Sequence, residues 1–160
     1  MGRQAAAIGE RLLKQVADAM KMLVLELDRE LRRVTPVDTG HARRNWVPSV
    51  GSQHTAEADD DAAHEQGIAD VLAYTLDKGP MWVSNVAPYI QLLNYGHSKQ
   101  RPAGFVEVSI DIAIQRTREK LAKKGSSVDL SAMQAEHRSQ SGAQAAGNVA
   151  SAYSPFGDDS

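Results

Sequence analysis

The N-terminal part of the chain carries the pattern that most limits what it can fold into. Apolar residues recur there at steps of three and four, the spacing of one helix face: Ile8, Leu12, Val16, Met20, Leu23, Leu27, Leu31 and Val34. The positions opposite are charged: Arg11, Lys14, Asp18, Lys21, Asp28 and Arg32. Pro36 predicts the end of this helix, because proline disfavours the helical conformation of the residue before it. A helix over 8–34 is far longer than the mean of about 11–12 residues, so we expect a partner to cover its apolar face.

The residues after this helix predict a small sheet and a second long helix. We predict strands over 41–50 and 81–86, and a short helix that Pro88 opens and Gly96 ends. Residues 106–122 alternate like a strand and also fit a helix, and their length favours the helix. The expected fold class is α+β, with a long N-terminal helix and a C-terminal helix packed on a small antiparallel sheet. The charged pair Glu30–Arg33 has the spacing that supports the first helix.

Charge and composition divide the chain further. Residues 51–80 carry seven acidic side chains and one basic, whereas residues 81–124 carry seven basic and three acidic, so the net charge of −2 averages opposite blocks. These two blocks are suited to pair across an interface between subunits. We predict one domain over 1–124, with an acidic loop insert over about 51–67. Residues 125–160 are rich in Ser, Ala, Gly and Gln, which indicates a flexible tail or an arm ordered by a partner.

Several classes of chemistry are not indicated. The chain has no cysteine, which excludes disulfides, thiolate metal sites and cysteine nucleophiles. It has no contiguous basic stripe of the kind that a DNA-binding module uses, and no apolar run of the roughly 18 residues that a membrane span needs. The five histidines lack zinc-enzyme spacing. We therefore expect no cofactor, no metal site and no membrane partner.

The tripeptide Asp38-Thr39-Gly40 also occurs in aspartic proteases, in which two such loops share a proton between carboxylates. Here a basic helix end and a proline precede it, and no Gly-rich apolar flap follows. We interpret these residues as a turn that Asp38 stabilises. A dimeric aspartic protease that uses Asp38 is kept as an alternative, and otherwise no catalytic residue is expected.

Two segments together resemble a known family. The first is Thr-Pro-Val-Asp-Thr-Gly-His-Ala-Arg-Arg-Asn-Trp over 35–46. The second, over 83–106, is Val-Ser-Asn-Val-Ala-Pro-Tyr-Ile-Gln-Leu-Leu-Asn-Tyr-Gly-His-Ser-Lys-Gln-Arg-Pro-Ala-Gly-Phe-Val. In this order, after a long helix, they resemble the neck proteins of long-tailed bacteriophages, the tail-completion or head–tail joining proteins. The resemblance covers roughly residues 5–122, and in that family the last segment is a helix packed on the sheet.

The resemblance implies a structural protein of the virion and not an enzyme. Such a protein, assembled in the host cytoplasm, forms a ring in the neck or upper tail that joins or completes the tail; a tail-tube terminator is the alternative. Its expected partners are other copies of itself, with six-fold symmetry, the connector or stopper protein, and the tail-tube or terminator protein. Genomic DNA is expected only as passing cargo.

The same resemblance provides the candidate motif and interface residues. They are Pro36, Asp38, Thr39, Gly40, Arg43, Trp46, Asn85, Pro88, Tyr89, Tyr95, Gly96, His97, Ser98, Pro102 and Phe105. In addition, we expect Asp59, Asp60 and Asp61 of the acidic insert to face the DNA channel of such a ring, where negative charge would keep the DNA from sticking.

Overall fold

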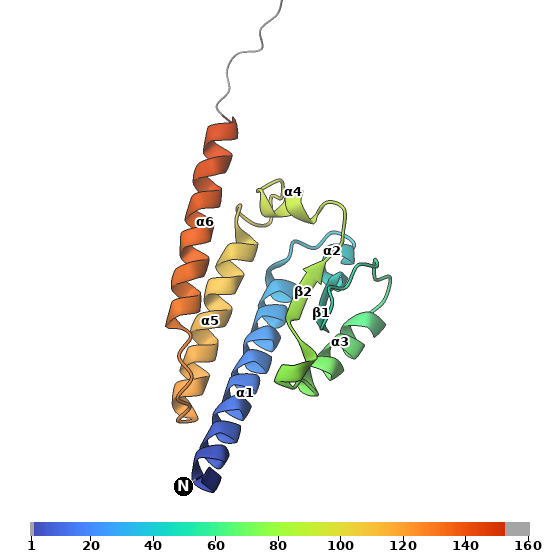
Figure 1. Cartoon of the computed structure of the whole chain (residues 1–160). Helices are drawn as coiled ribbons and strands as arrows, with labels where there is room; N and C mark the ends of the chain where they lie inside the picture. The colour runs from blue at the N-terminus through green and yellow to red at the C-terminus, as the bar shows by residue number, and fades with distance from the viewer. Residues whose placement is uncertain (1, 153–160) are drawn as a thin grey trace, which may run out of the picture. The chain divides into compact units, whose positions relative to one another are not determined.

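The computed structural model describes residues 2–152, and the chain divides into two compact units, residues 1–128 and 129–160. In chain order, the elements of the first unit are α1 (Gly2–Val34), α2 (His41–Arg44), β1 (Trp46–Val50), α3 (Ala62–Leu72), a 3₁₀ turn (Leu76–Lys78), β2 (Met81–Asn85), α4 (Ile90–Asn94) and α5 (Phe105–Lys123) (Figure 1). The second unit contains α6 (Ser131–Ala152).

The α+β fold class that the sequence predicts is confirmed. β1 and β2 form an antiparallel pair whose register runs from Trp46 opposite Asn85 to Val50 opposite Met81. The long helix ends at Val34, as Pro36 predicts, and the ambiguous stretch near the end of the first unit is the helix α5.

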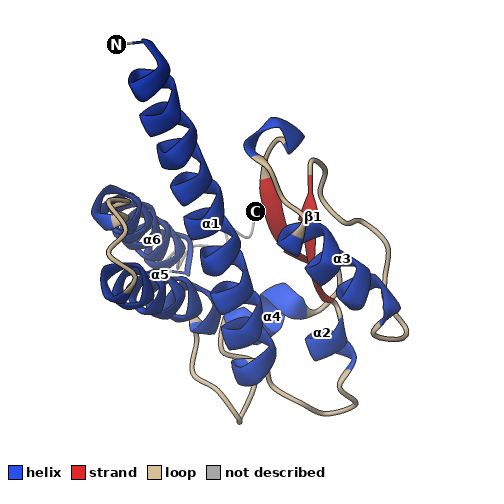
Figure 2. Ribbon diagram, turned by 90° about the horizontal axis from the view of Figure 1, so that it is seen from below, coloured by secondary structure: helices blue, strands red, loops and turns tan. Residues whose placement is uncertain are grey.

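Helix α1 is the central element of the first unit. Helix α5 runs beside it on one side, and the sheet with α3 lies on the other (Figures 1 and 2). The two long helices are antiparallel, since Glu26 contacts Lys120 and Glu30 contacts Arg116. Three of the six buried positions on α5 are small: Ser109, Ala113 and Thr117. Small side chains allow two helix backbones to approach closely.

A cluster of buried apolar side chains joins α1, the sheet and α5. It consists of Leu31, Val34, Trp46 and Phe105. The indole of Trp46 donates a hydrogen bond of 2.7 Å to Thr35 Oγ1, whose hydroxyl donates in turn to the Leu31 carbonyl at 2.6 Å. The large Trp46 ring is therefore buried without leaving its N–H unpaired. Helix α5 packs mainly along α1 and contributes Phe105 to this cluster.

The strand predicted over 41–50 is wrong in its first half, where the chain forms the helical turn α2. Gly40 precedes this turn with a φ of +83°, a conformation that glycine adopts without strain. The turn closes with hydrogen bonds from the backbone N–H and the side-chain amide of Asn45 to the His41 carbonyl, at 3.1 and 3.0 Å. The strand therefore begins only at Trp46.

The acidic insert is likewise not a loop throughout, because α3 begins at Ala62 and contains its last residues. The Asp60 carboxylate accepts a hydrogen bond of 3.0 Å from the Ala62 N–H, a bond that favours a helix start. The buried residues of α3 are Gly67, the last residue of the insert, and Val71, which lies beyond it. Helix α3 packs on β1.

The region 125–160 contains α6, a helix that the sequence analysis does not predict. Its residues include several Ala and Gln, which are good helix formers, although they show no sustained apolar period. Residues 153–160 of the predicted tail lie outside the described residues.

The apolar stripe of α1 is covered only in its second half. Ile8, Leu12 and Val16 remain 60%, 47% and 38% exposed. Further along the helix, the carboxylates of Glu26, Asp28 and Glu30 are buried instead. This half of α1 is therefore buried on more than one side.

Candidate functional site

An open cleft of about 850 Å³ is the candidate functional site. Residues 36–44 form one wall, and residues 89–100 form the other. The two motif segments, 35–46 and 83–106, therefore both contribute walls to a single cavity. Seven of the predicted candidate residues line it: Pro36, Asp38, Thr39, Gly40, Tyr89, His97 and Ser98.

The first wall is a tight turn followed by α2. The Thr39 hydroxyl accepts a hydrogen bond from the His41 N–H at 3.3 Å, and the Gly40 carbonyl accepts one from the Arg44 N–H at 3.1 Å. Asp38 is exposed in this turn, directly after the end of α1. Here it does not follow a buried strand, which is the setting that an aspartic protease needs.

The second wall is α4 and the loop that follows it. Gly96 has a φ of +90°, and the N–H groups of Gly96 and His97 bond to the Leu93 and Leu92 carbonyls at 3.2 Å. This is the way in which a glycine commonly ends a helix, as the sequence predicts. A Cβ on Gly96 would lie 3.2 Å from the Cβ of Ala103, so the following loop folds back closely here.

Gln100 joins the two walls. Its side-chain carbonyl accepts a hydrogen bond from the Val37 N–H at 2.9 Å, and its side-chain N–H donates to the Val37 carbonyl at 2.9 Å. The amide thus pairs with both backbone groups of one residue, as a neighbouring strand would. The sequence analysis missed Gln100, because nothing in its local pattern marks a partner 63 positions away.

Cationic side chains gather at this cleft. Arg44 and Lys99 line it, while Arg43 and Arg101 adjoin lining residues in the sequence. The Nε atoms of Arg43 and Arg44 are buried and make no hydrogen bond within the described structure. The lining carboxylate is that of Asp38, so the lining carries more positive than negative charge at neutral pH. We call this site, with its two lining cations Arg44 and Lys99, the cationic cleft.

The walls of the cationic cleft also contain apolar surface. Pro36, Ala42 and Leu93 line it, and the ring of Tyr89 is tilted against His41 with 6.2 Å between ring centroids. Such a mixture of apolar walls and a few polar groups is typical of sites that hold a side chain or a small molecule.

Residues 51–61, which we call the acidic loop, are fixed beside α2 by Asn45. The fully buried Asn45 side chain accepts a hydrogen bond from the Ala58 N–H at 2.9 Å and donates one to the Ala58 carbonyl at 3.2 Å. Arg32 donates to Asp61 at 2.8 Å and lowers the pKa of that carboxyl. Of the three candidates for a DNA channel, Asp61 is therefore paired, while Asp59 and Asp60 are exposed.

The remaining candidates separate into structural and exposed residues. Trp46 and Phe105 belong to the core. The side chain of Asn85 donates to the Ala42 carbonyl at 2.7 Å and accepts from the Ala87 N–H at 3.0 Å, and so connects α2 to the end of β2. Pro88, Tyr95 and Pro102 are exposed near α4 and the loop after it.

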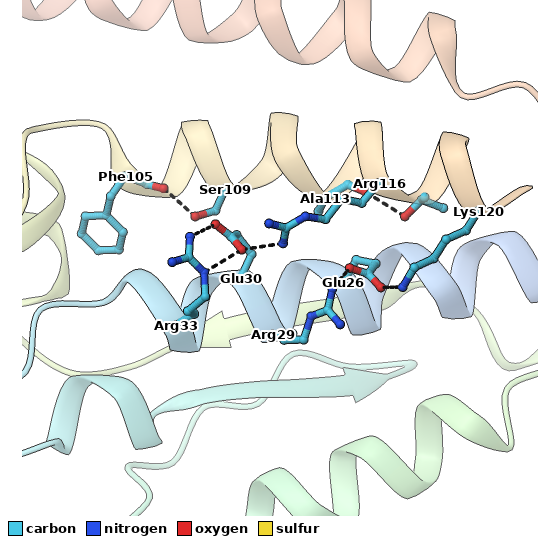
Figure 3. A network of polar contacts seen from close by, with 10 residues as sticks. Glu26, Arg29, Glu30, Arg33, Phe105, Ser109, Ala113, Arg116 and Lys120 are labelled. Atoms are coloured by element: carbon cyan, nitrogen blue, oxygen red, sulfur yellow. Dashed lines mark hydrogen bonds and ion pairs between the residues drawn. The ribbon is translucent and has the colours of Figure 1, made fainter.

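The seam between α1 and α5 contains buried carboxylates that sequence reasoning missed (Figure 3). Glu30 accepts hydrogen bonds from Arg33 at 2.5 and 3.1 Å and from Arg116 at 2.7 Å. The bonds from Arg33, followed by those from Arg116, lower the pKa of Glu30 despite its burial. Glu26 is bound in the same way by Arg29 and Lys120. The predicted Glu30–Arg33 pair is present, but only the fold brings Arg116 to it.

A further buried pair links α1 to α3. Asp28 contacts the His64 ring nitrogen Nε2 at 2.8 Å. Burial raises the pKa of Asp28, although His64 and Arg32 act in the opposite direction. The second oxygen of Asp28 is buried and has no hydrogen-bond partner in the described structure.

Among the residues that the structure describes, no three His, Asp or Glu side chains gather in a way that would hold a metal ion. No helix in the same part of the chain is both long and apolar enough to cross a membrane. When the chain is compared with protein-family models, with curated proteins and with solved structures, none of them matches it.

Proposed function

We propose that this chain is a structural virion protein of a long-tailed bacteriophage, a neck protein that forms a ring and joins or completes the tail. One observation carries the proposal. The two segments that resemble the neck proteins, 35–46 and 83–106, come together at one cleft although they lie far apart in the sequence. A pair of motifs that builds one surface is better explained by a shared role than by chance similarity of separate turns.

The exposed half of α1 supports an assembly of several copies. Ile8, Leu12, Leu13 and Val16 expose apolar surface on a helix that is otherwise well packed. Adjoining apolar side chains of this kind mark interaction surfaces. A ring with cyclic symmetry offers every copy the same neighbour, and six copies match the symmetry that the resemblance implies.

The expected partners follow from this role. They are the connector or stopper on the head side and the tail tube or terminator on the other, with genomic DNA passing through the ring. A tail-tube terminator is the neighbouring role within the same proposal. The aspartic protease receives no support, because Asp38 is exposed in a turn directly after a helix.

Deleting the gene from the phage that encodes it tests the proposal, with a plasmid copy as the control. We expect DNA-filled heads and separate tails in electron micrographs, and joined particles when the plasmid supplies the chain. Tails of uncontrolled length would instead identify a terminator, since a terminator stops a growing polymer. Normal infectious particles without the gene would refute the proposal, as would a particle reconstruction that places this chain outside the neck and upper tail.

A further inference from the structure

We propose that the cationic cleft of one copy receives the acidic loop of a second copy. The closure of such contacts into a ring rests on the proposed function, whereas the contact itself rests on charge and shape. These are the surfaces through which identical subunits would recognise one another.

Both surfaces carry charges that the chain leaves without ion-pair partners. Lys99 is an exposed residue of the cleft lining and Arg101 is an exposed residue two positions further on, and neither makes an ion pair among the described residues. Asp59 and Asp60 are exposed on the acidic loop, and within the same part of the chain neither takes part in an ion pair. Each surface therefore offers the charge that the other lacks.

The surfaces also match in form and in hydrogen-bonding capacity. The cleft is concave and open, whereas the acidic loop exposes most of its residues to solvent. A carboxylate from another copy would accept hydrogen bonds from the cations that line the cleft, Arg44 and Lys99, and such bonds between charged groups are about twice as strong as neutral ones.

A second copy fits the cleft better than DNA does. Two cations line the cleft, Arg44 and Lys99, and they do not make the stripe that follows a phosphate backbone. Pro36, Ala42 and Leu93 give the cleft apolar walls, for which the backbone of duplex DNA has no counterpart. A cleft and a loop are also different surfaces, so a contact between them can repeat from copy to copy and close into a ring.

A charge-swap experiment on the full chain tests the contact. One variant combines Lys99→Glu and Arg101→Glu, and a second combines Asp59→Lys and Asp60→Lys. Self-association is measured by sedimentation velocity at low and high salt, and circular dichroism establishes that each variant is folded. The matched control combines Lys123→Glu and Lys124→Glu, the same change of charge at exposed positions at the end of α5.

We expect the wild type to self-associate at low salt and to dissociate as salt screens the charges. Each swapped variant alone should associate about ten-fold or more weakly, because its loop and its cleft then carry the same sign. A mixture of the two variants should associate again, with alternating copies, and the control should behave as the wild type.

Three results would overturn the contact: a monomeric wild type at low salt, swapped variants that associate as well as the wild type, or a mixture that stays as weak as its components. Duplex DNA that binds the wild type and not the Lys99→Glu, Arg101→Glu variant would assign the cleft to nucleic acid instead. Different results would refute the proposed function. If the mixed variants formed only dimers, the contact would be supported and the ring refuted. If phage particles were normal without the gene, the role in the virion would be refuted and the contact would stand.

Discussion

Replacing Gly67 by alanine tests how α3 is seated on the sheet. A Cβ at this position would lie 2.0 Å from the backbone carbonyl oxygen of Pro48 in β1, whereas ordinary contacts begin at 3.4 Å. Helix and strand would therefore have to separate by about 1.4 Å, the difference between these two distances. The obstacle is a backbone atom, which no change of rotamer can move away.

The expected loss of unfolding free energy in Gly67→Ala is the balance of two opposing effects. Overpacking costs about 1–3 kcal/mol, and we expect the upper end because the backbone of a strand must shift. Alanine recovers about 1 kcal/mol through its higher helix propensity. The net loss is about 2 kcal/mol, which corresponds to a fall in the melting temperature of roughly 4–8 °C for a chain of this size.

The assay is urea denaturation followed by circular dichroism, with Gly9→Ala as the control. Gly9 also lies in a helix, but a Cβ there meets nothing within 4 Å. That variant should gain about 0.5–1 kcal/mol. If Gly67→Ala is as stable as the wild type, or gains as much as Gly9→Ala, then α3 does not pack on β1 in the way described.

Three further predictions concern hydrogen-bonded or ion-paired polar side chains. Asn45→Ala leaves the N–H and carbonyl of Ala58 without their partners and should cost about 2–4 kcal/mol in chemical denaturation; a loss below about 0.5 kcal/mol would contradict this reasoning. Gln100→Ala should speed amide hydrogen exchange at Val37 and in residues 97–101 without changing the exchange of α5; unchanged exchange at Val37 would disprove the bridge. The lowered pKa of Glu30 means that its contribution to stability is present above its ordinary pKa of 4.5 and is lost as the pH falls through the folded-state value. The stability advantage of the wild type over Glu30→Gln should therefore shrink on acidification. Because the pKa of Asp28 is raised, the stability of the wild type relative to Asp28→Asn should instead increase on acidification. If both differences changed in the same direction, these assignments would be wrong.

The sequence predicts those parts of the fold that local signals determine. Pro36 predicts the end of α1, and Gly96 predicts the end of α4, because each acts on the backbone of its own neighbours. The periodicity of α1 predicts the helix itself. Its length also suggests a partner, and the second half of the helix has partners within the chain.

The sequence does not predict features that depend on distant partners. Glu30 looks like a surface residue until Arg116, 86 positions away, is brought to it by the antiparallel packing of α5. Residues 41–44 show no strong helical pattern, and α2 forms because Gly40 and Asn45 close its two ends. The two walls of the cationic cleft come together only in the fold, where the amide of Gln100 and the ring contact between His41 and Tyr89 link them.

Two amides, those of Asn45 and Gln100, fix backbones rather than side chains. Each pairs with the N–H and the carbonyl of a single distant residue, Ala58 in one case and Val37 in the other. The position of the acidic loop is therefore determined mostly by residues outside that loop, such as Asn45. Its exposed residues are free to change charge or size while their position is kept, so selection can alter what this region recognises without redesigning the fold.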